Sequence, residues 1–99
     1  MNIIYRKRGQ GKTTELIKIS AETRCYIVCE SQSVAITIQR NATELGYNIP
    51  LPLTYSEFLH HRYYAHGIKG LLIDNAELLL EYISKEVPIH TITMTDLNN

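Results

Sequence analysis

Short apolar runs punctuate the chain, and four of them are rich enough in β-branched and aromatic residues to predict strands. These predicted strands cover residues 3–5, 25–28, 68–73 and 89–94. Stretches long enough for helices separate them, so the strands are expected to pair in parallel through right-handed crossovers. The pattern therefore predicts an α/β layered domain whose ligand sits beyond the carboxyl ends of its strands.

The intervals between these runs carry helix signals. A first helix is expected over residues 12–19, and a second begins at a cap provided by Ser31 or Ser33 and ends at Gly46. The apolar face of the second helix is Val34, Ile38, Ala42 and Leu45. Both helices then have one apolar side with which to cover a sheet.

The second half of the chain repeats this alternation. Residues 47–53 contain two prolines and are expected to form an extended connection. Thr54 and Glu57 have the spacing of a capping box, which predicts a helix from there to Gly67. A last helix is expected over residues 76–85, before Pro88.

Composition limits what such a domain can be. The 99 residues, 44% of them apolar, fit one domain spanning residues 1–99 and leave no room for a second. Ten basic and ten acidic side chains balance, which argues against disorder. This balance gives no global reason to expect a polyanionic or membrane partner. No apolar run approaches the ~18 residues of a membrane span. The apolar stretch at the start of the sequence is too short for a signal peptide. We therefore expect a cytoplasmic protein with no membrane association.

The balanced charge conceals a gradient along the chain. Residues 1–24 carry six of the ten basic side chains, and residues 69–99 carry five acidic ones against two basic ones. An ordinary dipolar surface would account for this. Charge alone favours that interpretation, and the alternative is a phosphate and metal pocket built from a basic start and later carboxylates.

The first predicted strand runs into a basic turn that contains two glycines. Glycines let successive backbone N–H groups turn inward around a phosphate, and the following helix N-terminus adds partial positive charge. A lysine at that point reaches phosphate oxygens, and the next hydroxyl coordinates Mg²⁺. The candidate phosphate-binding residues are Arg8, Gly9, Gln10, Gly11, Lys12, Thr13 and Thr14.

This turn resembles the Walker A loop of P-loop NTPases, whose pattern is G-x-x-x-x-G-K-S/T. The chain departs from it at the first position, where Arg6 replaces glycine. The resemblance implies ATP and Mg²⁺ as ligands, with Lys12 on the phosphates and Thr13 on the metal.

The third predicted strand delivers an aspartate to its end, and the segment resembles a Walker B motif. Asp74 would then hold Mg²⁺ opposite Thr13. Many P-loop ATPases of the catalytic-glutamate division carry a glutamate directly after this aspartate, where Asn75 stands here. An amide can hydrogen-bond a water molecule but cannot take its proton, so slow hydrolysis is expected unless Glu77 substitutes.

Several relatives share parts of this pattern. The loop is similar to that of HerA/FtsK-type DNA-pumping ATPases, of small phage-encoded ATPases and of type II thymidine kinases, and residues 25–59 are similar to the first core of superfamily 1 and 2 helicases. The RecA-like resemblance implies a three-layer P-loop domain with a four-stranded, mainly parallel sheet in the order 1-4-3-2. Its last strand would carry Thr93 or Thr95 as a polar sensor.

Three functions stay open on these grounds. The first is Mg-dependent ATP binding with slow hydrolysis, for which the resemblance implies a role in viral or mobile-element DNA metabolism. The second is a nucleotide-gated adaptor that does not hydrolyse ATP and serves a larger partner, and the third is a nucleoside or nucleotide kinase. An uncovered sheet edge favours a protein partner or a second copy. The basic run Arg6–Lys7–Arg8 leaves open an arginine finger, a nucleic-acid contact or a solvated loop.

Overall fold

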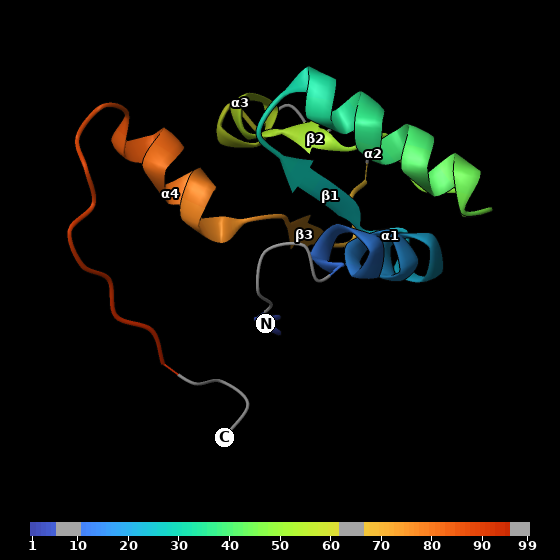
Figure 1. Cartoon of the computed structure of the whole chain (residues 1–99), viewed down its shortest axis with the longest axis horizontal. Coiled ribbons are helices and arrows are strands. Elements are labelled where there is room, and N and C mark those ends of the chain that lie inside the picture. Colours follow the sequence, from blue (N-terminus) through green and yellow to red (C-terminus); the bar gives the residue numbers. More distant parts are fainter. Residues whose placement is uncertain (6–10, 62–66, 96–99) are drawn as a thin grey trace.

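The structure is a computed structural model that describes residues 1–5, 11–61 and 67–95. Its helices are α1 (Lys12–Thr23), α2 (Gln32–Glu44), α3 (Tyr55–Leu59) and α4 (Ala76–Ser84). Its strands are β1 (Tyr26–Cys29), β2 (Leu53–Thr54) and β3 (Leu71–Ile73). Figure 1 shows α1 and α2 gathered around the sheet, whereas α4 and the segment after it extend to one side.

The strands form a parallel sheet in the order β2-β1-β3. In its register, Val28 of β1 lies opposite Leu53 on one side and Ile73 on the other. The strand period of two sends alternate β1 residues to opposite faces. An α/β fold with a parallel sheet and flanking helices is therefore confirmed.

One face of the sheet carries the larger core. Ile27 and Cys29 of β1 point to this face, where α1 and α2 supply most of the packing partners. The members of this cluster are Leu16, Ile17, Ile27, Cys29, Ala35, Ile38, Ala42 and Ile49. The opposite face holds a smaller cluster built on Val28, Leu53 and Tyr55, against which parts of α3, β3 and α4 pack.

Local capping explains where α2 and α3 begin and where α2 ends. Ser31 is the N-cap of α2, and its hydroxyl accepts a hydrogen bond from the Val34 amide at 3.3 Å. Thr54 and Glu57 form the expected capping box at the start of α3. The chain leaves α2 through Gly46, whose φ of 85° favours glycine. The sequence signals for these boundaries were sufficient.

The four-stranded sheet in the order 1-4-3-2 is not what the structure shows. Residues 3–5 and 89–94 form no strand. The short β2 instead joins Leu53, the last residue of the predicted connection, to Thr54, which was predicted only as a helix cap. The side chains of Ile92 and Met94 are 53% and 55% exposed, so this segment buries too little apolar surface to hold it in a ladder. The two segments still touch, because the Tyr5 hydroxyl lies 3.9 Å from the Met94 sulfur.

The remaining elements differ from their predicted bounds by a few residues. α1 continues to Thr23, and α3 ends at Leu59, ahead of Gly67; residues 62–66 of that predicted helix lie outside the described part. β3 begins after Gly70, where the backbone passes so near to Cys25 that a Cβ would lie 2.9 Å from its sulfur. α4 matches its prediction within one residue.

Candidate functional site at the carboxyl edge of the sheet

The candidate site lies where α1 begins and where β1 and β3 end. Gly11 precedes α1 with φ 76° and ψ 25°, a left-handed conformation that glycine adopts without steric strain. From this turn the chain enters the helix directly at Lys12. The first N–H groups of a helix have no partner within the helix, so this end carries the partial positive charge that anions prefer.

Two side-chain contacts join this helix start to the end of β3. The Lys12 ammonium donates a hydrogen bond to Asn75 Oδ1 at 3.1 Å. The Thr13 hydroxyl donates to Asp74 Oδ2 at 3.4 Å. The two pairs are 63 and 61 residues apart in the sequence. The fold therefore brings together Lys12, Thr13, Asp74 and Asn75, four of the residues singled out from the sequence.

Asp74 is the most buried charged group in this arrangement. Its side chain is 6% exposed, and its backbone amide continues the ladder by donating to the Val28 carbonyl at 3.0 Å. Burial raises the pKa of this carboxyl, while the charge of Lys12 and the Thr13 hydrogen bond lower it. The charges of Glu77 and Glu30 raise it further. A second cation beside Asp74 would favour its ionised form.

The donors at this point fit Mg²⁺ by their chemistry. Mg²⁺ takes hard oxygen ligands, usually one or two carboxylates together with water and phosphate. Asp74 and Thr13 offer a carboxylate and a hydroxyl that already lie within hydrogen-bonding distance of each other. Among residues 1–5, 11–61 and 67–95, no group of three His, Cys, Asp or Glu side chains could hold a metal ion by itself. The described donor set thus suits a metal that shares its coordination with a phosphate.

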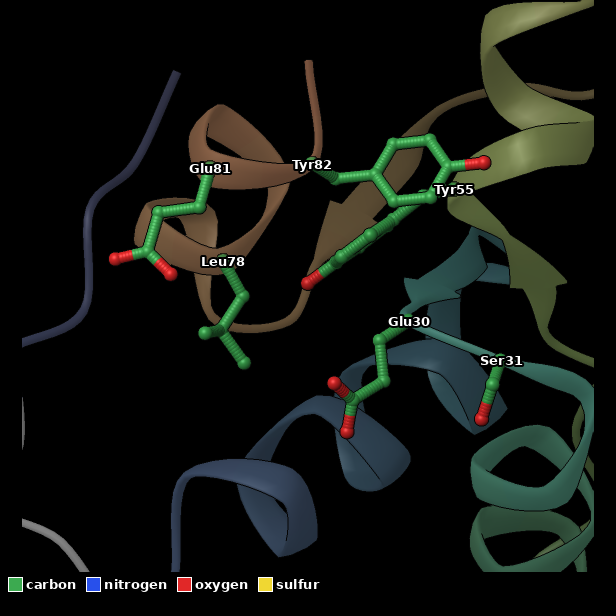
Figure 2. Close-up of a pocket in the computed structure, with 6 residues that line it drawn as sticks. All are labelled: Glu30, Ser31, Tyr55, Leu78, Glu81 and Tyr82. Atoms are coloured by element: carbon green, nitrogen blue, oxygen red, sulfur yellow. The ribbon is translucent and has the colours of Figure 1, made fainter. Parts of the chain in front are cut away.

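Tyr55 fixes the backbone that carries these residues. Its side chain is buried, and its hydroxyl donates to the carbonyls of Asp74 at 2.9 Å and Asn75 at 3.2 Å. Burial, together with the charge of Asp74, raises the pKa of Tyr55 above its usual range, so the hydroxyl keeps its proton. Figure 2 shows the Tyr55 hydroxyl end pointing toward the turn that leads from β3 into α4.

A cleft of about 400 Å³ opens beside this turn (Figure 2). Its lining residues come from the segment directly after β1, from the start of α3 and from α4: Glu30, Ser31, Tyr55, Leu78, Glu81 and Tyr82. The rings of Tyr55 and Tyr82 meet edge to face, with centroids 5.7 Å apart. The cleft therefore continues the carboxyl edge at which the Lys12 and Asp74 contacts occur.

Glu30 is the residue at this edge that the sequence interpretation missed. It follows β1 directly and lines the cleft beside the turn from β3 into α4. Its side chain is exposed into the cleft, and its charge acts on Asp74, Tyr55 and Cys29. A signal was available, because an acidic residue directly after a buried strand stands at the expected ligand edge.

The other predicted site residues lie in different surroundings. Arg8, Gly9 and Gln10 fall outside the described residues. Thr14 is half-buried in the first turn of α1, and Glu77 is exposed in the first turn of α4. The two sensor candidates, Thr93 and Thr95, are exposed in a segment that is not a strand.

Comparison with protein-family models, with curated proteins and with solved structures gives no match for this chain. Within the described residues, no helix is long and apolar enough to cross a membrane.

Proposed function

We propose that the protein binds a nucleoside triphosphate, ATP in the first instance, together with Mg²⁺ through a P-loop-type site at the start of α1. The observation that carries this proposal is the convergence of Lys12 and Thr13 with Asp74. A cationic side chain, a hydroxyl and a carboxylate at a helix N-terminus form the minimum set for a metal-bound polyphosphate. The function therefore follows from residues that lie far apart in the sequence.

Each residue has a separate role in this proposal. Lys12 binds oxygens of the terminal phosphates, and the backbone of Gly11 lets the chain pass close to them. Thr13 and Asp74 would hold Mg²⁺, which supplies charge neutralisation on the phosphates when bound. Tyr55 keeps the carbonyls of Asp74 and Asn75 in place from below the site.

Hydrolysis needs one further group, because Asn75 cannot accept a proton. Both Glu30 and Glu77 are exposed, but of the two only Glu30 lines the cleft at this edge. In the reaction we propose, a water oxygen attacks the γ-phosphorus and the bond to the β–γ bridging oxygen breaks. The Glu30 carboxylate accepts the proton of that water.

Nucleotide binding is tested with a fluorescent ATP analogue, titrated in the presence of Mg²⁺ and again in EDTA. We expect saturable, Mg-dependent binding by the wild type and its loss in Lys12→Ala. Lys18→Ala is the matched control, since Lys18 is exposed on the same helix beyond the site. Absence of binding by the folded wild type, or an equal loss in both lysine variants, would remove the proposal.

The adaptor function is the second candidate, and the side chain of Asn75 favours it. Phosphate release from ATP separates it from hydrolysis. If the protein hydrolyses ATP, the wild type should release phosphate at a measurable rate. Glu30→Gln should abolish this release, whereas Glu81→Gln, in the same cleft, should preserve it. Binding without release by the wild type would instead support the adaptor.

A further inference from the structure

Asn75 differs from the other polar residues that begin helices in this molecule. Ser31 and Thr54 have extended backbones, with φ of −156° and −85°, and each side chain accepts a hydrogen bond from its own helix. Asn75 precedes α4 with φ 55° and ψ 69°, and its side chain makes no capping bond. A capping asparagine ordinarily has an extended backbone and accepts from an amide in the first turn.

The side-chain oxygen of Asn75 has Lys12 as its hydrogen-bond partner instead of an amide of α4. The Lys12 ammonium donates to Asn75 Oδ1, the atom that would otherwise cap α4. The Tyr55 hydroxyl holds the Asp74 and Asn75 carbonyls in the same arrangement. The backbone carbonyl of Asn75 still accepts hydrogen bonds from the Leu78 and Leu79 amides at 2.9 and 3.3 Å. A rotation of the Asn75 backbone therefore changes the hydrogen bonds at the start of α4.

Lys12 cannot satisfy Asn75 and a phosphate equally well. A phosphate carries more negative charge than an amide oxygen, so it competes for the ammonium with a stronger hydrogen bond. Once released, Asn75 can relax to the extended conformation and cap α4. No residue of α4 is buried, and its packing rests on the partly buried Leu78 and Leu79 and on the ring of Tyr82, so few contacts oppose this change.

We propose that Asn75 is a positioning residue that ties Lys12 to α4, so that phosphate binding switches Asn75 from the left-handed to the extended backbone and resets the start of α4. This regulation rests on the proposed function, because the phosphate that displaces Asn75 is the one bound by Lys12. It makes α4, with its cleft-lining Leu78 and Tyr82, the element that responds to the ligand.

The first test needs no ligand. In solution NMR of the full chain, Lys12→Met removes the tie, while Lys18→Met is the control on the same helix. We expect Lys12→Met to change the amide-to-Hα coupling of Asn75 toward that of an extended residue and to slow the exchange of the Leu78 amide. Asn75 retaining its positive φ in Lys12→Met would overturn the proposal.

The second test uses inorganic triphosphate without metal as the probe, with affinities measured by calorimetry in EDTA. Triphosphate is expected to produce the same changes at Asn75 and Leu78 as Lys12→Met. Asn75→Gly, which keeps the left-handed backbone available, removes the competing oxygen and should bind triphosphate roughly fivefold more tightly. Unchanged or weaker binding by a folded Asn75→Gly would overturn the tie.

The two tests fail separately. If the wild type binds no triphosphate, the proposed function is contradicted, and the Lys12→Met spectrum still decides whether Lys12 holds Asn75. If triphosphate binds while Asn75 and Leu78 do not respond, the site stands and the coupling to α4 is wrong.

Discussion

The part of the molecule formed by β1, α1 and α2 buries far more apolar side chains than the part that follows β3. On the side of β1, helices α1 and α2 close over a core in which Ile27 and Ala35 have no exposed surface. Beyond β3, α4 contains no buried residue, and Ile92 and Met94 in the following segment are largely exposed. The candidate site lies between the two, with Lys12 and Thr13 on the packed side and Asp74 and Asn75 on the other.

This difference indicates which part of the molecule can hold a ligand in place and which part can move when the ligand binds. Free energies of local opening follow buried apolar contact, so α1 is expected to stay in place while α4 moves. In our proposal the ligand binds at Lys12 and the buried Asp74, and the response occurs in α4, which begins two residues after Asp74. Substitutions in either part of the molecule test this comparison.

The largest expected effect is a core truncation on the packed side. Ile27→Ala removes side-chain atoms from a residue with 0% exposure and should lower the free energy of unfolding by about 2–5 kcal/mol. Ile83→Ala, at a residue of α4 that is 51% exposed, should change it by less than about 0.5 kcal/mol. Urea denaturation measures both, and similar losses in the two variants would contradict the comparison.

The next effect concerns the hydroxyl that connects the two sides. Tyr55→Phe removes the hydroxyl that donates to the Asp74 and Asn75 carbonyls and should destabilise the fold by about 1–3 kcal/mol. Tyr82→Phe is the control, because Tyr82 is 45% exposed and its ring contact with Tyr55 survives. Equal stability of the two variants in the same denaturation experiment would mean that Tyr55 acts only through its ring.

A smaller effect is expected at the start of α3. Thr54→Ala removes the side-chain half of the capping box and should lower the free energy of unfolding by about 1 kcal/mol. Thr43→Ala, at an exposed position whose hydroxyl bonds only within α2, provides the comparison and should change it little. A Thr54→Ala variant as stable as the wild type would show that the cap contributes nothing.

The smallest effect is a dependence on alkaline pH. Burial raises the pKa of the Cys29 thiol from its ordinary 9.0 to about 11. Between these values the unfolded chain loses a proton that the folded chain keeps, so stability should fall as pH rises through this window. Thermal midpoints at pH 8, 9 and 10 test this, and Cys29→Ala should flatten the slope; an unchanged slope in that variant would contradict the assignment.

The sequence was informative where local chemistry decides structure. The caps at Ser31 and Thr54, the turn at Gly46 and the bounds of α4 depend on neighbouring residues and could be predicted. The resemblance to the Walker motifs also placed Thr13 opposite Asp74, and the two side chains do lie in contact. The contact of Lys12 with Asn75 was not anticipated.

The sequence was less informative where partners are distant. Residues 89–94 have strand-forming side chains, but strand propensity does not supply a hydrogen-bonded neighbour. Leu53 and Thr54 became β2 because they lie beside β1, which no local pattern reveals. Glu30 was missed although it directly follows a buried strand, because only the fold shows that it lines the cleft near Asp74.

The most direct test of the central claim is a double-mutant cycle on Thr13 and Asp74. The quantity measured is the increase in ATP affinity produced by Mg²⁺, for the wild type, Thr13→Val, Asp74→Asn and the double variant. If the two side chains hold one metal, Asp74→Asn should abolish the increase, and Thr13→Val should add nothing further to that loss. A full Mg²⁺-dependent increase in Asp74→Asn, or independent and additive losses in the cycle, would contradict a shared metal and phosphate site.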